Sequence, residues 1–222
     1  MADWAIIFDV DGVLLELTRA EEDIFFDSFE KHGDPQTLYR DWNSYRIRND
    51  EDIMAEIAAR WNIAPEHLQR IKEKYFSCLG NALSNEHITT PIIAGADTLL
   101  KRCADIATLG IATANFRQAA KLRLEHAGLW QPVSAHAFGA DGGGHKHEIL
   151  ARALASLPVP RTNIIYVGDN LNDVEAGLKN QLHFIGFSTS QERLKQLEAH
   201  GAEHVSNNHA KTWELISLLR KS

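Results

Sequence analysis

The chain has 222 residues, of which 44% are hydrophobic and 24% charged, the composition of an ordinary globular protein. Its formal net charge is −7 and the charges are scattered without a basic stripe, so we expect neither nucleic acid nor a membrane as a partner. The first apolar run stops at Asp9, and the two cysteines lack the spacing of a metal site. We therefore expect no signal peptide, no membrane span and a cytoplasmic protein with reduced thiols.

The first predicted element is a buried strand over residues 5–8, and two carboxylates follow it. Asp9 and Asp11 are two positions apart, so an extended backbone would aim both side chains at one face, while Gly12 lets the chain turn away. Carboxylates at the end of a buried strand need a cation or hydrogen-bond donors nearby. We therefore expect a metal site or an acid–base pair here. A plain strand-end turn is the alternative, because Asp-Gly is a common turn pair.

The segment from about residue 18 to residue 83 is predicted to be a block of about four helices. Its apolar residues recur at helical spacing, and Pro35 and Pro65 are suited to first helical turns. The aromatic residues of this block follow the same spacing, so we expect them to form its core rather than to bind a ligand ring. They are Phe25, Phe26, Phe29, Trp42, Tyr45 and Trp61.

From about residue 90, short apolar runs alternate with amphipathic helices. The predicted strands are 106–113, 133–138, 163–167 and 182–187, and the predicted helices are 94–102, 116–127, 146–157, 171–179, 191–199 and 213–219. Such alternation specifies a parallel sheet with helices on both faces, and ligands bind beyond the carboxyl ends of its strands. The predicted fold class is therefore α/β, with a three-layer Rossmann-like core and an inserted helical subdomain.

Polar residues follow several of these strands, and neighbouring parallel strands would bring them to one crevice. They are Thr113 and Asn115, Lys146 after the glycine-rich loop 142–144, and Asp169 and Asp173 after the strand 163–167. With Asp9 and Asp11, the crevice would hold four carboxylates. These would repel one another, and a bound hard divalent cation usually offsets such repulsion. A calcium-binding loop does not fit, because Leu171 and Val174 stand where a ligand and a glycine are required.

These residues resemble the four ordered motifs of the haloacid dehalogenase-like hydrolase superfamily. The matching segments are Phe8-Asp9-Val10-Asp11-Gly12-Val13, Thr113-Ala114-Asn115, Lys146, and Gly168-Asp169-x-x-x-Asp173. The helical block resembles the cap of the branch that contains phosphoglycolate phosphatase and β-phosphoglucomutase. The resemblance covers essentially the whole chain, and it implies a catalytic core of residues 1–15 and 86–222 with a cap of residues 16–85.

The resemblance further implies a phosphoric monoester hydrolase, a Mg²⁺-dependent phosphatase that acts on a small phosphorylated metabolite through an aspartyl-phosphate. Asp9 would be the nucleophile, and Asp11 the general acid and then the general base. The presence of Asp11 favours phosphoryl transfer over dehalogenation. Asp9, the carbonyl of Asp11, and Asp169 would hold Mg²⁺. The phosphate-binding residues would be Thr113, Ala114, Asn115 and Lys146, with Asp173, Asn115 and Asn170 in supporting roles.

The third motif departs from the family pattern, which commonly has proline after the lysine. Here His147 follows Lys146, so Lys121 and Lys179 are alternatives, although both fall inside predicted helices. His145 and His147 flank the lysine, and we expect a surface or substrate-steering role for them rather than a second metal site.

In the cap, Arg46 and Arg48 lie where related enzymes place a specificity loop. A guanidinium suits an acidic group or a second phosphate, and a solvated connection between helices is the alternative. No lysine occurs between Lys31 and Lys72, which argues against the phosphonate-cleaving members of the family. A phosphomutase of the β-phosphoglucomutase type and a catalytically idle, phosphometabolite-binding member remain alternatives. Either a monomer or a homodimer is expected.

Overall fold

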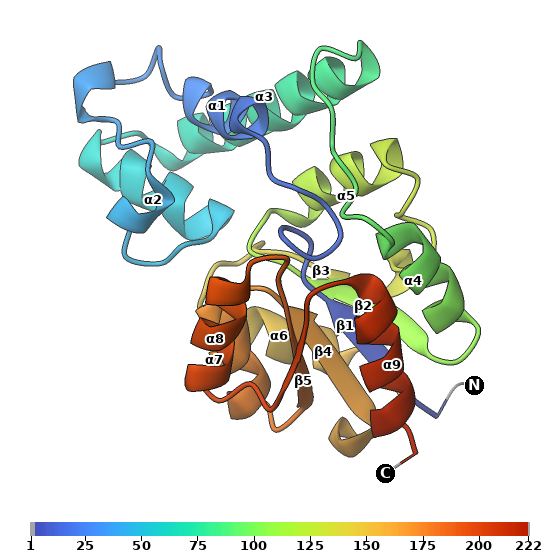
Figure 1. The fold of residues 1–222 in the computed structure, drawn as a ribbon. Helices are drawn as coiled ribbons and strands as arrows, with labels where there is room; N and C mark the ends of the chain where they lie inside the picture. The colour runs from blue at the N-terminus through green and yellow to red at the C-terminus, as the bar shows by residue number, and fades with distance from the viewer. Residues whose placement is uncertain (1–2, 222) are drawn as a thin grey trace.

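The computed structural model describes residues 3–221, and a parallel β-sheet of six strands lies at its centre. The strand order is β3-β2-β1-β4-β5-β6 (Figure 1). The strands are β1 Ala5–Phe8, β2 Thr108–Ala112, β3 Ala137–Phe138, β4 Ile164–Gly168, β5 His183–Phe187 and β6 His204–Ser206. Ala5 of β1 lies opposite Thr108 of β2 and Ile164 of β4. The predicted α/β class with a Rossmann-like parallel sheet is confirmed.

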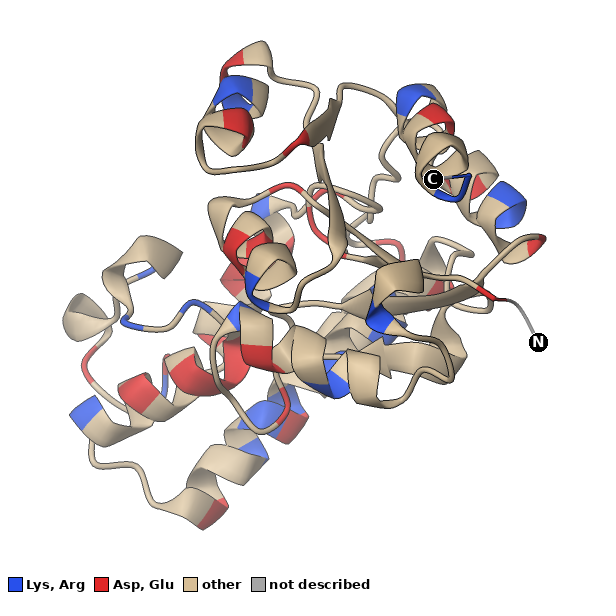
Figure 2. Ribbon diagram, turned by 90° about the horizontal axis from the view of Figure 1, so that it is seen from below, with Lys and Arg blue, Asp and Glu red and all other residues tan. Residues whose placement is uncertain are grey.

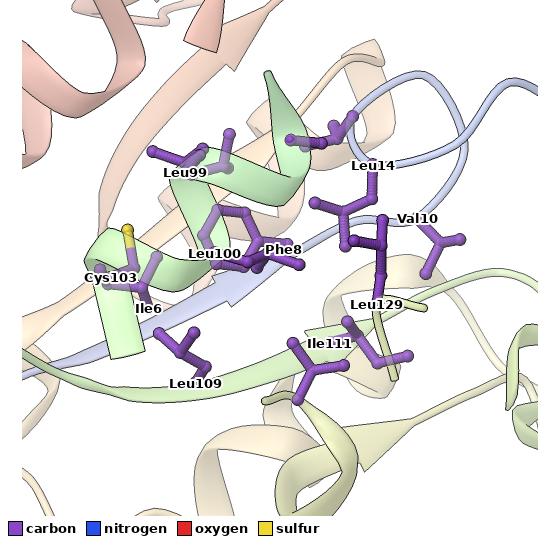
Figure 3. Close-up of a cluster of buried hydrophobic side chains, with 14 of the residues drawn as sticks. Ile6, Phe8, Val10, Leu14, Leu99, Leu100, Cys103, Leu109, Ile111 and Leu129 are labelled. Atoms are coloured by element: carbon purple, nitrogen blue, oxygen red, sulfur yellow. The ribbon is translucent and has the colours of Figure 1, made fainter. Parts of the chain in front are cut away.

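Helices cover both faces of this sheet, because β1 carries apolar side chains on both sides. The covering helices are α4 Ala96–Ala104, α5 Arg117–His126, α6 Lys146–Ala155, α7 Leu171–Lys179, α8 Gln191–Ala199 and α9 His209–Leu219. Ile6 and Phe8 pack with α4, α5 and α9, and Figure 3 shows this cluster around α4. Ala5 and Ile7 pack on the other face with α6, α7 and α8. The alternation of side-chain directions along β1 thus produces the three layers.

Three further α-helices form a helical unit beside the sheet (Figure 1). They are α1 Arg19–Asp27, α2 Asp50–Arg60 and α3 Pro65–Ser84. They pack around a separate cluster of buried side chains that includes Phe25, Phe26, Phe29 and Tyr45. Phe116, the residue before α5, belongs to the same cluster. The expectation that the aromatic residues form a core therefore agrees with the packing, although Trp42 and Trp61 are only partly buried.

The block contains three α-helices, where the sequence predicts about four helices. Among the described residues, the segment between α1 and α2 contains only two 3-10 turns, Pro35–Thr37 and Trp42–Ser44. The side chains of Asp34 and Asp41 accept hydrogen bonds from backbone N–H groups two residues ahead. Such local bonds favour single turns over a continued helix.

The predicted elements of the sheet region differ from the structure at three places. The strand β6 was missed, because its sequence His204-Val205-Ser206 has only one apolar residue. The last helix begins at His209 rather than at residue 213, because the Asn208 side chain caps it by accepting from the Lys211 N–H. The strand predicted over 133–138 shortens to two residues, since Ser134–His136 forms a 3-10 turn.

Acidic and basic residues are interspersed over the layers of the molecule (Figure 2). In the part of the chain that the structure describes, none of the helices has the length and apolarity needed to cross a bilayer.

Candidate active site

A cavity of about 1290 Å³ lies between the carboxyl ends of the strands and the helical unit. It brings together all of the residues proposed from the sequence for catalysis, metal binding, phosphate binding and cap specificity. They are Asp9, Asp11, Arg46, Arg48, Thr113, Ala114, Asn115, Lys146, Asp169, Asn170 and Asp173. The motif residues reach the cavity because β1, β2 and β4 are parallel neighbours and therefore end at the same edge of the sheet. Arg46 and Arg48 reach it from the connection between α1 and α2.

Lys146 stands at the centre of the acidic residues. Its Nζ atom lies 2.8 Å from Asp9 Oδ2 and 3.0 Å from Asp173 Oδ1, and its side chain is only 8% exposed. Burial opposes the charge on this ammonium group, but Asp173 and Asp9 outweigh burial and raise the pKa of Lys146. The alternatives Lys121 and Lys179 instead pair with glutamates one turn away on their own helices. The structure therefore places Lys146, and not these two, against the carboxylates.

Asp9, Asp169 and Asp173 form a compact acidic cluster. One carboxylate oxygen from each lies within 4.8 Å of the others. Burial raises the pKa of Asp9 to about 7; Lys146 works against this shift and Asp173 adds to it. Burial, Asp173 and Asp9 raise the pKa of Asp169 to about 8. Three carboxylates outnumber the single ammonium of Lys146, and this oxygen-only, negatively charged donor set fits a hard divalent cation.

Asp173 is held from several sides. Its Oδ1 atom accepts a hydrogen bond of 2.5 Å from the Tyr166 hydroxyl, and its Oδ2 atom accepts one of 3.0 Å from the Asn170 N–H. Asn170 is also the N-cap of α7, and Asp173 completes its capping box. Asn170 and Asp173 therefore cap the start of α7, and the Asp173 carboxylate also contacts Lys146.

Gly12 allows the first motif to pass close to the fourth. Its φ angle is +73°, a conformation that residues with side chains rarely adopt. A Cβ atom at this position would lie 2.2 Å from Asp169 Oδ2. The tight passage explains why glycine follows the two aspartates.

The loop after β2 supplies Thr113 and Asn115. Thr113 is buried, and its Oγ1 atom accepts a hydrogen bond of 3.2 Å from the Asn115 N–H. The carboxamide oxygen of Asn115 accepts one of 3.0 Å from Arg123 Nη1, so Arg123 fixes this side chain.

The N-terminus of α2 contacts the loops that carry the predicted catalytic residues. Asp50 accepts a hydrogen bond of 2.7 Å from the Phe116 N–H, and its own N–H donates to the Ala114 carbonyl. Asp52 Oδ2 accepts one of 2.8 Å from the Gly144 N–H, while Asn49 Nδ2 donates to the Gly144 carbonyl at 2.8 Å. These contacts hold the helical unit over the cavity.

Sequence reasoning missed Arg123, Glu21 and Asp50. Each is buried and bonded across the boundary between the sheet region and the helical unit. Burial raises the pKa of Asp50 to about 8; the Phe116 N–H works against this shift and Asp11 adds to it. Arg123 and Glu21 occupy helical positions that read as ordinary surface charges, so no local signal distinguishes them.

Comparison with known proteins agrees with this geometry. Residues 6–187 match the family model described as haloacid dehalogenase-like hydrolase. No curated protein matches the chain. The solved structures similar to it include CbbY from Rhodobacter sphaeroides in complex with phosphate, with a TM-score of 0.71 and 19% identity over 95% of this chain and 96% of that chain. A mutant of the same protein was also solved in complex with xylulose-(1,5)bisphosphate.

Two other similar structures have comparable scores. A hydrolase from Pseudomonas syringae has a TM-score of 0.70 and 16% identity, covering 97% of this chain and 98% of that chain. A protein described as a predicted phosphatase from Clostridium acetobutylicum has a TM-score of 0.64 and 22% identity, covering 96% and 100%. At these identities the likeness shows a shared fold. Because the family model matches most of the sequence, this chain belongs to the haloacid dehalogenase-like hydrolase family, and the predicted class of enzyme is confirmed.

Proposed function

We propose that the protein is a Mg²⁺-dependent phosphatase that hydrolyses a small phosphorylated metabolite through an aspartyl-phosphate on Asp9. The observation that carries this proposal is the position of Asp9. Its carboxylate lines the cavity, contacts Lys146, and lies within the acidic cluster of Asp169 and Asp173. Residues 1–15 and 86–222 would be the catalytic core and residues 16–85 the cap, in keeping with the separate aromatic cluster of the helical unit.

In the first step, an oxygen of Asp9 attacks phosphorus, and the bond between phosphorus and the leaving oxygen breaks. Asp11 gives its proton to that oxygen, which departs as an alcohol. In the second step, Asp11 takes a proton from water, whose oxygen attacks phosphorus and releases phosphate from Asp9. Thr113 and Lys146 would hold the phosphoryl oxygens and stabilise their charge in both transition states.

Asp9, the Asp11 carbonyl and Asp169 would hold Mg²⁺, with Asp173 beside them. The bound cation would neutralise charge on the phosphoryl oxygens and would keep Asp9 and Asp169 ionised. This second effect matters because burial raises the pKa of Asp9 to about 7, and a nucleophile must be ionised.

The cavity suggests a substrate with a second anionic group. Arg46 and Arg48 line the same space as Asp9, and both belong to the proposed cap. The bisphosphate bound by the Rhodobacter sphaeroides protein supports this proposal. The free thiols of Cys78 and Cys103 support a reducing compartment, and we propose the cytoplasm.

Replacement of Asp9 tests the proposal. Wild-type protein is assayed for phosphate release from a panel of sugar monophosphates and bisphosphates with Mg²⁺ and with EDTA. We expect Asp9→Asn to lower kcat by about 10⁴-fold or more. The matched control is Asp97→Asn, at a half-exposed position on α4, which should leave kcat unchanged. Full activity in Asp9→Asn, or in EDTA, contradicts the proposal.

The product assay and a binding assay separate the alternatives. A phosphomutase would form an isomeric sugar phosphate without releasing inorganic phosphate. A catalytically idle member would turn over none of the panel, and it would not bind beryllium fluoride together with Mg²⁺ at Asp9.

A further inference from the structure

Arg123 makes a second buried charge centre beside the cavity. This residue of α5 is 2% exposed. Its guanidinium donates hydrogen bonds to Glu21 Oε1 at 2.6 Å, Asn115 Oδ1 at 3.0 Å and the Glu16 carbonyl at 3.2 Å. Its Nη2 atom also forms an ion pair with Asp11 Oδ1 at 2.7 Å. A guanidinium is planar and its N–H groups have fixed directions, so the three hydrogen bonds fix its orientation, and its charge then attracts the Asp11 carboxylate to one position beside it.

The partners of Arg123 come from different parts of the molecule. Asp11 and Glu16 belong to the segment after β1, Asn115 to the loop after β2, and Glu21 to helix α1 of the helical unit. Glu21 is buried as well, and its Oε2 atom accepts hydrogen bonds from the backbone N–H and the hydroxyl of Thr18. Both partners of the Arg123–Glu21 pair are therefore held by further hydrogen bonds, which restrict the position of the guanidinium.

Asp11 is the carboxylate of this centre that lines the cavity. Its side chain is 26% exposed, whereas those of Arg123 and Glu21 are each 3% exposed. Glu21 alone would neutralise Arg123, so the buried pair needs no further carboxylate. The contact with Asp11 instead holds one carboxylate oxygen of a side chain that would otherwise rotate freely about two bonds.

We propose that Arg123 is a positioning residue that orients the Asp11 carboxylate toward the leaving oxygen of the substrate. The inference rests on the proposed function, in which Asp11 is the proton donor and acceptor. Arg123 does not touch the phosphoryl group in this scheme. It acts through Asp11, and its own position depends on Glu21 of α1.

The direct variant is unsuitable as a test, because Arg123→Met would leave Glu21 buried without its partner and would endanger folding. The double variant Glu21→Gln/Arg123→Met removes both charges together. Its matched control is Glu21→Gln alone, in which the glutamine oxygen still accepts from Arg123 Nε and Arg123 still contacts Asp11, while the glutamine NH2 group faces Thr18 and the hydrogen bond from the Thr18 N–H is lost. Thermal unfolding of both variants checks that they fold.

The readout is the dependence of kcat/KM on the leaving group. This constant covers the reaction up to phosphoryl transfer to Asp9, where proton donation helps an alkyl leaving group but not p-nitrophenolate. For a sugar phosphate, we expect the double variant to lose about 10- to 100-fold, since small misplacements of a catalytic group cost that much. For p-nitrophenyl phosphate, the loss should be less than about threefold. Glu21→Gln should stay within about threefold of wild type on both substrates.

Two further measurements distinguish positioning from a purely structural role. In an Asp11→Asn background, the double replacement should cause no further loss on the sugar phosphate, because the residue through which Arg123 acts is gone. Binding of beryllium fluoride with Mg²⁺, which uses Asp9 but no proton donor, should be unchanged within about twofold.

Equal losses on both substrates, additive losses in the Asp11→Asn background, or loss of fluoride binding would overturn the inference. A wild-type protein that hydrolyses neither substrate would instead contradict the proposed function. The two failures are thus separate outcomes.

Discussion

Two buried cationic side chains, Lys146 and Arg123, lie beside the cavity, and they contact different parts of the molecule. Lys146 contacts Asp9 and Asp173, all three on segments that follow strands of the sheet. Arg123 contacts Asp11 of the same region but also Glu21 of the helical unit. The lysine centre is therefore complete within the sheet region, whereas the arginine centre needs the helical unit in place. This contrast predicts that phosphate binding tolerates displacement of the helical unit better than proton transfer does.

Removal of the lysine centre should have the largest effect. In Lys146→Met, the acidic cluster loses the ammonium group that contacts it, and the phosphoryl oxygens lose a cationic partner. We expect kcat/KM to fall by about 10³-fold. The matched control is Lys179→Met. Lys179 lines the same cavity, but its side chain is half exposed and pairs with Glu175 on its own helix. A Lys146→Met protein within tenfold of wild type would show that the lysine centre is not needed for catalysis.

Crowding the same centre should have a smaller effect. Gly12→Ala places a Cβ atom against Asp169, so we expect weaker Mg²⁺ binding, lower activity and a loss of stability of about 1–3 kcal/mol. Gly128→Ala is a close control, because Gly128 has a φ angle of +72° and a Cβ atom there would meet nothing within 4 Å. It should lose stability only. Isothermal titration with Mg²⁺ separates the two, and equal affinities in both variants would contradict the explanation.

The contact between the two regions should depend on pH through Asp50. Its folded-state pKa of about 8 lies above its ordinary value of 3.8, so folding favours the protonated form. The stability that this preference contributes is complete below pH 3.8 and is lost as the pH rises through about 8. Asp50→Asn keeps an oxygen for the Phe116 N–H and does not ionise.

The unfolding free energy of wild type, relative to Asp50→Asn, should therefore decrease over this pH range. The slope should be at most about 1.4 kcal/mol per pH unit, the limit for one proton. Asp23→Asn, at a partly exposed position on α1, serves as the control for replacing a carboxylate away from this contact. Parallel curves for wild type and Asp50→Asn would mean that Asp50 does not titrate in this range.

The lysine centre was accessible from the sequence, and the arginine centre was not. Asp9, Lys146 and Asp169 follow apolar strands, where polar residues need a chemical reason, and parallel topology then brings them to one edge. Arg123 lies in α5, where a charged residue among alanines and leucines looks solvated. Only tertiary packing places Glu21 against it, about a hundred positions earlier in the chain.

The same difference separates the elements of the fold that could be predicted from the sequence from those that could not. Strong alternation of apolar runs and helices specified the central strands and the layers. The short edge strand β6 has one apolar residue, and the 3-10 turns between α1 and α2 depend on local side-chain bonds. Elements defined by buried patterns could be predicted, while elements defined by a few hydrogen bonds could not.

The contact of Gly144 with α2 has a kinetic consequence. Gly144 lies two residues before Lys146. Its N–H donates a hydrogen bond to Asp52, and its carbonyl accepts one from Asn49. This amide hydrogen is protected from solvent only while the helical unit stays in place. The rate of its exchange with deuterium would therefore measure how often the helical unit opens to admit substrate and release product. The amide that reports this rate lies on the loop that carries Lys146.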